Sequence, residues 1–413
     1  MENLILQHTK DYDESNSLHD KTINKKVTRE LLKTLTNSHI STKQLLRERK
    51  IKRYLTRFRL SELQEDLFDS RYVYKDIKKY METYYTHKMI YSFKVGHRKI
   101  EVIFYLEDYD EKEITLCGER IEKIITLLFF LSTYSNNNCS KYLKIHCCLT
   151  NLKKKLPSDM LDVLDVEHIN SAVTTSCTTS GSLVIYREEE WFKVLIHELF
   201  HVMGLDFSSS HSDMYTSKLR EELNVDSEFL IYETYCEFWA TIINTLFYSY
   251  FVLYSLSDLN EIRFDDFYTI NKVNLNIEIT FSLIQVNKIL SHMHLEYQQL
   301  WSDKIQHKSL RNMLYKENTN VLAYYIFKTA LLLNKEHMFE WLYTHNTNLL
   351  NFKETPDNIK LFCDEIIRLS KKQSTINRIK YGEQVLKKIL KKNLKTELMN
   401  KILKSTNMTL LSV

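Results

Sequence analysis

A chain of 413 residues, 44% hydrophobic and 27% charged, has the composition of a globular protein long enough for two or three domains. The formal net charge of +4 is too small to indicate nucleic-acid binding by itself, and the scarcity of glycine and proline favours long helices. Seven cysteines without paired spacing predict reduced thiols. No basic region followed by a long apolar run opens the sequence, so we expect an intracellular protein with no secretory signal and no membrane span.

The first 88 residues are predicted to form an N-terminal helical arm. Residues 1–40 are polar and poorly patterned, which favours an irregular segment, whereas residues 41–68 follow a helical pattern. The second of these segments carries a basic run at 47–59. A solvated helix face is the simpler interpretation of this run, and contact with nucleic acid or an acidic partner is the alternative.

Near residue 89 the pattern changes to that of a small mixed sheet. Segments rich in Ile, Val, Tyr and Phe predict a hairpin made of 89–93 and 99–106. An apolar helix is predicted at 112–134, and further strands are predicted at 143–149 and 182–186. The fold class expected from this order is α+β, predominantly α.

Beyond the sheet the pattern is helical almost to the end of the chain. Two helices are predicted at 189–205 and 226–256, and the tail at 371–404 is helical and strongly basic. This tail is a second segment for which contact with nucleic acid or a protein partner is an alternative to simple solvation. We expect an arm, a core containing the sheet, a helical subdomain and a basic tail, at 1–88, 89–260, 261–370 and 371–413.

The sharpest motif lies in the helix predicted at 189–205. His197-Glu198-Leu-Phe-His201 has the form H-E-x-x-H, and residues four apart share one helix face, so both imidazoles can reach one ion. Zinc favours nitrogen ligands, and a catalytic site leaves one position for water, whose pKa the metal lowers from about 15.7 towards 7. Glu198 could accept that proton and pass it to a leaving amine. A chance match is the simplest alternative, but the flanking residues are apolar, and buried polar side chains are costly without partners. The motif therefore predicts a zinc metallopeptidase of the zincin type.

The third ligand must come from elsewhere in the chain. Glu233 and Glu237, on the next predicted helix, match the gluzincin pattern Glu-x-x-x-Asp/Glu. In this hypothesis Glu233 binds the metal and Glu237 accepts a hydrogen bond from a liganding histidine, with His197 the expected partner. A solvent-exposed acidic face is the simpler alternative for the two carboxylates.

Two other hypotheses remain for that ligand. Gly204 falls where the metzincin pattern H-E-x-x-H-x-x-G-x-x-H has its glycine, but Phe207 stands at the third-ligand position. His211 would then be the ligand, with Met214 imitating a Met-turn. The last hypothesis has no protein ligand beyond the two histidines.

A zinc peptidase also needs a donor for the oxyanion of the tetrahedral intermediate. Tyr324 and Tyr325, in a predicted helix, are candidates for this role, as is His292 or His294. Each is more often an ordinary core or surface residue.

The region from about 90 to 345 resembles a family of uncharacterised zinc-metallopeptidase-like proteins found in large DNA viruses of eukaryotes. The resemblance implies Glu233 as a gluzincin-like ligand and a viral protein in the host cytoplasm or the virion, but it supplies no substrate. Weaker similarity lies at 281–286 and 317–330. Three segments carry the resemblance, namely Asn170-Ser-Ala-Val-Thr-Thr175, Glu190-Trp-Phe-Lys-Val-Leu-Ile-His-Glu-Leu-Phe-His-Val-Met-Gly-Leu-Asp-Phe207 and Glu233-Thr-Tyr-Cys-Glu-Phe-Trp-Ala-Thr-Ile-Ile-Asn244.

Three functions compete on this evidence. The leading hypothesis is a zinc metalloendopeptidase with Glu198 as general base. The alternative is a virion-associated structural or interaction protein in which the metal only stabilises the fold, since a fold never proves an activity. A hydrolase of a non-peptide amide is the third. The presence of Glu198 favours catalysis, because a purely structural site needs the two histidines but no base.

Overall fold

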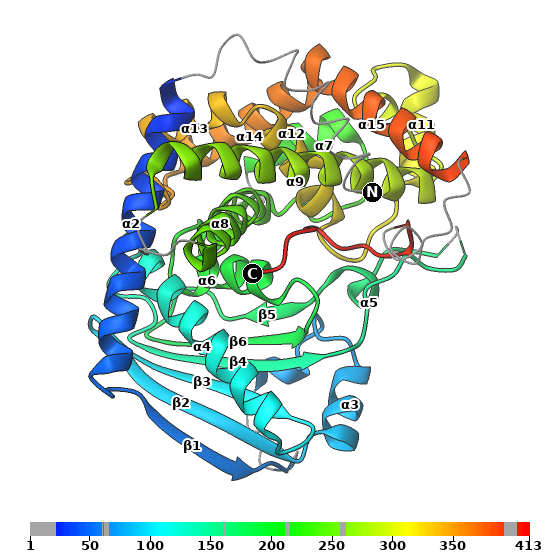
Figure 1. The fold of residues 1–413 in the computed structure, drawn as a ribbon. Helices are drawn as coiled ribbons and strands as arrows, with labels where there is room; N and C mark the ends of the chain where they lie inside the picture. The colour runs from blue at the N-terminus through cyan, green and yellow to red at the C-terminus, as the bar shows by residue number, and fades with distance from the viewer. Residues whose placement is uncertain are drawn as a thin grey trace.

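The structure is a computed structural model that describes residues 22–59, 61, 66–159, 162–210, 215–256, 262–391 and 403–413. Within these residues the chain is α+β and predominantly helical, which confirms the predicted fold class. A six-stranded mixed sheet forms one layer, and helices stack above it in the view of Figure 1. The metal-site helices predicted from the sequence lie where these two layers meet.

The sheet has the strand order β1-β2-β3-β4-β6-β5. β3, β4 and β6 run parallel to one another, and the other neighbours pair antiparallel. The predicted hairpin and the two further predicted strands are present. The strands are β1 (Lys52–Arg57), β2 (His87–Val95), β3 (Arg98–Leu106), β4 (Tyr142–Thr150), β5 (Ala172–Thr174) and β6 (Ser180–Arg187).

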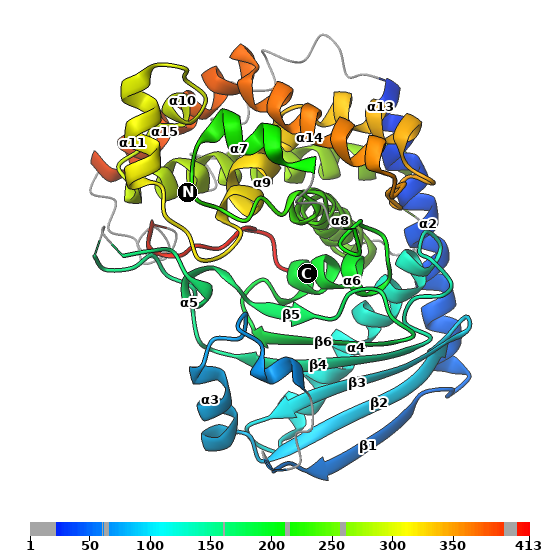
Figure 2. The ribbon, with the colours of Figure 1, turned by 180° about the vertical axis from the view of Figure 1, so that it is seen from behind.

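Apolar residues bury the inner face of the sheet and part of its outer face. The inner face packs against α4 (Glu111–Ser132), the apolar helix predicted at 112–134, and contributes to the main core. Half of the outer face is covered by α3 (Asp76–Tyr84) and the short helix at Asp66–Asp69, through a smaller core that includes Tyr105 and Tyr186. Figure 2 shows α3 against this side of the sheet.

The upper layer is built around α6 (Trp191–Val202) and α8 (Ile231–Leu256), which correspond to the helices predicted at 189–205 and 226–256. The long helix α9 (Phe264–His292) crosses above α8 (Figure 1). The short helix α5 (Val166–Ile169) lies at the level of β5, beside the sheet (Figure 1). The other described helices of the upper layer are α7 (Ser217–Leu223), α10 (Tyr297–Leu300), α11 (Ile305–Leu314), α12 (Lys328–Leu333), α13 (Lys335–His345), α14 (Pro356–Lys371) and α15 (Gln373–Lys391). Among the described residues, each helix is too short or too polar to cross a bilayer.

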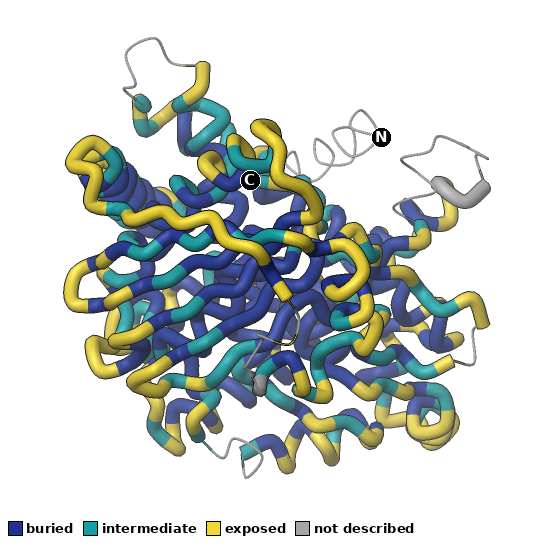
Figure 3. The backbone as a smooth tube through the Cα atoms, turned by 90° about the horizontal axis from the view of Figure 1, so that it is seen from below, coloured by how far each residue is buried: buried dark blue, intermediate teal, exposed yellow. Residues whose placement is uncertain are grey.

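Two expectations for the N-terminal region are wrong. Part of the segment expected to be irregular lies in α2 (Thr22–Arg47), a helix that packs on both α4 and α13 and so joins the two layers. The basic run does not continue as a helix, because the chain leaves α2 at Arg47 and forms strand β1. Pairing with β2 overrides the local helical pattern. β1 is exposed along its whole length in the view of Figure 3, and its charged side chains suit a sheet edge. Residues 1–21 lie outside the described residues.

The end of the chain also differs from expectation. The basic tail is helical through α15, and residues 392–402 lie outside the described part. The segment 405–411, the end of the expected tail, is irregular, and it runs between the layers to end near α6 (Figure 1). Two buried carboxylates hold its backbone: Glu190 accepts from the amides of Met408 and Thr409, and Glu278 accepts from those of Leu410 and Leu411. These amides are satisfied by side chains from other elements, an arrangement that local sequence does not reveal.

The expectation of seven reduced thiols is wrong for two of them. Cys139, just before β4, and Cys177, in the connection between β5 and β6, form a disulfide with a Cα–Cα distance of 5.0 Å. The parallel pairing of β4 with β6 brings these distant positions together. The other five cysteines are buried free thiols.

Candidate metal centre

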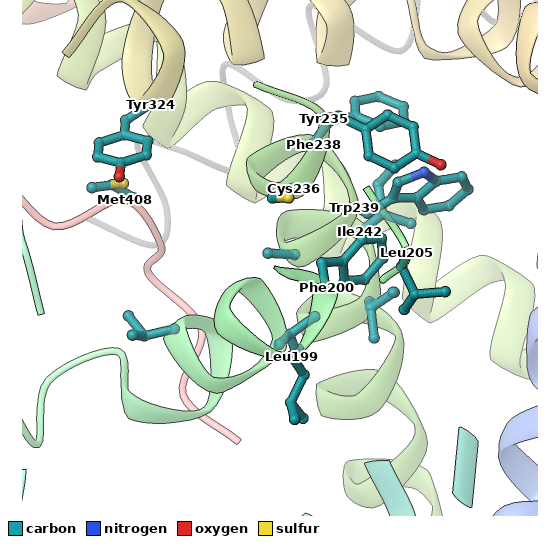
Figure 4. Close-up of a cluster of buried hydrophobic side chains, with 14 of the residues drawn as sticks. Leu199, Phe200, Leu205, Tyr235, Cys236, Phe238, Trp239, Ile242, Tyr324 and Met408 are labelled. Carbon is teal, nitrogen blue, oxygen red and sulfur yellow. The ribbon is translucent and has the colours of Figure 1, made fainter. Parts of the chain in front are cut away.

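The site is built on two packed helices, α6 and α8. Every residue of α6 is buried, so the helix lies fully inside the protein. Its apolar residues Leu199 and Phe200 belong to the same buried cluster as Phe238 and Trp239 of α8 (Figure 4). This apolar packing holds the polar residues of the two helices in fixed positions.

His197, His201 and Glu233 converge on one point. The Nε2 atoms of the two histidines lie 3.1 Å apart, as expected for residues one helical turn apart on α6. The Oε2 atom of Glu233, in the first turn of α8, lies 2.9 Å from Nε2 of His197 and 3.5 Å from Nε2 of His201. Three potential ligand atoms, all buried, therefore face one another. Two imidazole nitrogens and one carboxylate are a donor set that zinc binds in catalytic sites, so the residues present fit this metal.

The other nitrogen of His197 faces Glu237. The distance from Nδ1 to Oε1 of Glu237 is 2.9 Å, which is the arrangement predicted from the spacing of the two glutamates. Glu237 also forms a buried ion pair with Lys193, one turn before His197 on α6. A carboxylate in this position fixes the tautomer and ring orientation of a liganding histidine.

His201 has a matching partner that the sequence reasoning missed. Its Nδ1 atom lies 2.6 Å from Oδ2 of Asp206, a buried side chain. α6 ends at Val202, and Gly204 adopts a left-handed φ of +63°, which turns the chain back towards the helix. A side chain at Gly204 would also collide with Cys139. The signal for Asp206 was its position two residues after this helix-ending glycine.

Glu198 lies on the wall of a small cavity. The cavity has a volume of about 220 Å³, and its wall includes Glu198, both histidines, Glu233 and Tyr324. Burial raises the pKa of Glu198, although the two neighbouring imidazoles oppose that shift. A carboxylate with a raised pKa beside a metal-ligand cluster has the properties expected of a general base working near neutral pH.

The charges in the cluster are strongly coupled. Burial raises the pKa of Glu233, but the imidazoles outweigh it and lower the value to about 2. Burial lowers the pKa of His197, but Glu233 and Glu237 outweigh it and raise the value to about 9. Without a metal, the carboxylates therefore hold protons on the imidazoles. Zinc binding would have to displace those protons, so its affinity should depend on pH.

Comparison of the chain with protein-family models, with curated proteins and with solved structures finds no match. The geometry of the chain itself must therefore support any functional conclusion.

An edge strand of the sheet lies beside the cavity. It is not the strand predicted at 182–186, which lies in β6 and has neighbours on both sides. The edge strand is β5, whose three residues Ala172–Thr174 all line the cavity. β5 packs against α6 and is too short to be distinguished from a loop by periodicity.

The structure separates the candidates for the oxyanion donor. Tyr324 and Tyr325 lie in a π-helical turn at Leu322–Phe327, and only Tyr324 lines the cavity, with its ring 5.7 Å from that of His197. Tyr325 points elsewhere and donates to the backbone of Thr406. His292 contacts the carbonyl oxygen of Asp162, and neither it nor His294 lines the cavity.

The metzincin hypothesis is only partly open to inspection. His211 and Met214 lie outside the described residues. Phe207 is fully buried and packs on Phe352, with the ring centroids 4.2 Å apart. A second group of potential ligands exists nearby, because Cys236 lies 3.7 Å from Nδ1 of His201 and 3.6 Å from Asp206. This group would use the nitrogen of His201 that faces Asp206, so the two arrangements are alternatives.

Proposed function

We propose that the protein is a zinc-dependent metallopeptidase. The observation that carries this proposal is the convergence of His197, His201 and Glu233 on one point of a cavity that Glu198 also lines. A metal site that only stabilises the fold needs the ligands but has no use for a buried carboxylate on the same wall. The arrangement therefore favours catalysis over the scaffold hypothesis.

Each residue of the site has a separate role in peptide hydrolysis. Zinc, when bound by the two histidines and Glu233, would polarise the scissile carbonyl and make water more acidic. Glu198 takes the proton of the attacking water and later delivers it to the leaving amine. The hydroxyl of Tyr324 donates to the oxyanion. Asp206 and Glu237 hold the two imidazoles in their liganding orientation.

The edge strand favours a peptide over a small amide as substrate. β5 pairs with β6 through Ser171, which accepts from the amide of Tyr186, and through Thr175, which donates to Ser182. Backbone groups alternate in direction along a strand, so those of Ala172 and Thr174 point away from β6. An extended peptide could pair with this free edge beside the cavity. The viral, host-cytoplasmic or virion-associated setting remains a proposal that rests on the sequence resemblance.

The test compares the zinc-loaded full chain with its Glu198→Gln variant on a proteome-derived peptide library, with bound zinc counted in both. We expect near-stoichiometric zinc in both proteins and a loss of cleavage of about 10²-fold or more in the variant. Glu221→Gln, an exposed glutamate on α7, is the matched control and should cleave normally. Equal zinc together with equal cleavage, or no cleavage by any of the proteins, would favour the scaffold hypothesis.

A further inference from the structure

The outer face of the sheet is only half covered. Where β3, β4 and β6 approach α3, their outward residues belong to the smaller core with Tyr105 and Tyr186. At the other end of the same strands, the outward positions of this face are polar. Those positions border a groove of about 1030 Å³.

The strand register aligns these polar positions in two rows across the sheet. We call the two rows the basic platform. The first row crosses five strands and consists of Lys52, Ser92, Glu101, Lys144 and Ser182. The second row crosses four strands and consists of Lys94, Lys99, Tyr142 and Ser180.

The charge of the groove is strongly one-sided. Five lysines and a single acidic residue, Glu101, line it among the described residues. One of these lysines, Lys50, lies beside the platform and comes with Lys52 from the basic run of the sequence. Such a concentration of positive charge attracts a polyanion, although the net charge of the whole chain is small.

An exposed aromatic ring lies within this charge. Tyr142 is 51% exposed, and Nζ of Lys99 lies 5.1 Å from the centre of its ring. An exposed ring in a groove lined by lysines suits stacking with a base while the lysines contact phosphates. An acidic protein could bind the lysines without using the exposed ring of Tyr142. The bases of a duplex are stacked on one another, so their faces are not accessible to this ring.

We propose that the basic platform binds single-stranded nucleic acid, with phosphates on the lysines and a base stacked on Tyr142. This function is separate from the proposed peptidase. The groove shares no lining residue with the cavity that contains His197, His201 and Glu198. Binding at the platform therefore should not require zinc or an intact general base.

The experiment measures binding of a fluorescein-labelled oligothymidylate of about 20 nucleotides to the full chain by fluorescence anisotropy. The charge reversal Lys94→Glu/Lys99→Glu changes two exposed residues beside the β2–β3 turn, and Tyr142→Ala removes the ring. We expect each variant to weaken binding about tenfold or more. The wild-type affinity should also fall steeply with salt. Lys360→Glu, an exposed lysine on α14, is the matched control and should bind normally.

Unchanged thermal unfolding of each variant shows that a loss of binding is not a loss of folding. Failure of the wild-type chain to bind the oligonucleotide would overturn the proposal, as would equal binding by wild type and the charge-reversal variant. If polyglutamate competes as well as an unlabelled oligonucleotide and Tyr142→Ala does not change binding, the surface binds an acidic protein instead. Binding should persist in Glu198→Gln, which separates this result from the fate of the peptidase proposal.

Discussion

The Nδ1 atom of His201 lies 2.6 Å from Oδ2 of Asp206, so the second histidine of the motif is oriented by a carboxylate only five residues further along the chain. Removing such a partner typically weakens metal binding by about 10–100-fold. We therefore expect Asp206→Ala to lower zinc affinity by that factor, measured by competition with a chelator. Ser208→Ala is the control, because Ser208 lines the same cavity but donates to the other oxygen of Asp206. Equal zinc affinity in Asp206→Ala and the wild type would show that His201 needs no such partner.

The buried pair between Lys193 and Glu237 is predicted to matter for stability and for the metal in different ways. Lys193→Met removes the lysine that neutralises the buried Glu237 and leaves this carboxylate with His197 as a remaining partner, so the variant should lower the free energy of unfolding by at most about 3–5 kcal/mol in urea titrations. The double variant Lys193→Met/Glu237→Leu should lose less free energy of unfolding than the sum of the losses in the two single variants. It should bind zinc more weakly than the wild type, because His197 loses its partner Glu237. Additive losses of stability would contradict this coupling.

The disulfide between Cys139 and Cys177 should stabilise the fold without serving the chemistry. It closes a loop over a sequence separation of 38, for which chain entropy predicts a stabilisation of about 3–4 kcal/mol. Cys177→Ser should therefore lower the melting temperature, while stoichiometric zinc binding is kept. A reductant should lower the melting temperature of the wild type but not that of the variant. If the reductant does not change the melting temperature of the wild type, that result would contradict a stabilising disulfide between Cys139 and Cys177.

Lys288 provides a pH-dependent term in the stability. It lies in the interior near the C-terminal segment, donates to the carbonyl oxygen of Ser405, and burial lowers its pKa from 10.5 to about 7. Between pH 7 and 10.5 this lysine binds a proton in the unfolded chain but not in the folded one, so the free energy of unfolding rises with pH over this range. Below about pH 7 the full destabilisation caused by burying this lysine is present. We expect Lys288→Met to unfold with a shallower rise over this range and to be more stable near pH 7. Parallel pH profiles for the two proteins would refute the assignment.

The sequence predicted the parts of the site that depend on local spacing. His197, Glu198 and His201 share one helix, Glu233 and Glu237 share another, and the structure brings both sets together. Positions four apart on a helix lie on one face whatever the rest of the fold does, which is why these predictions needed no tertiary information.

What the sequence could not predict depends on distant segments. The partner role of Asp206 needs the chain reversal at Gly204, and Lys193 meets Glu237 only because α6 packs on α8. β5 is too short for a periodic signal, and β1 was concealed by a pattern that also suits a helix. The irregular 405–411 segment has backbone amides that donate to Glu190 and Glu278, which lie far away in the sequence.

X-ray absorption at the zinc edge of the zinc-loaded full chain tests the central claim most directly, because it distinguishes the two ligand groups that share His201. Ligation by His197, His201 and Glu233 predicts only nitrogen and oxygen neighbours at about 2.0–2.2 Å, with the outer-shell scattering of two imidazoles. A sulfur neighbour at about 2.3 Å would place the metal on Cys236 and Asp206 instead, and would contradict the proposed centre.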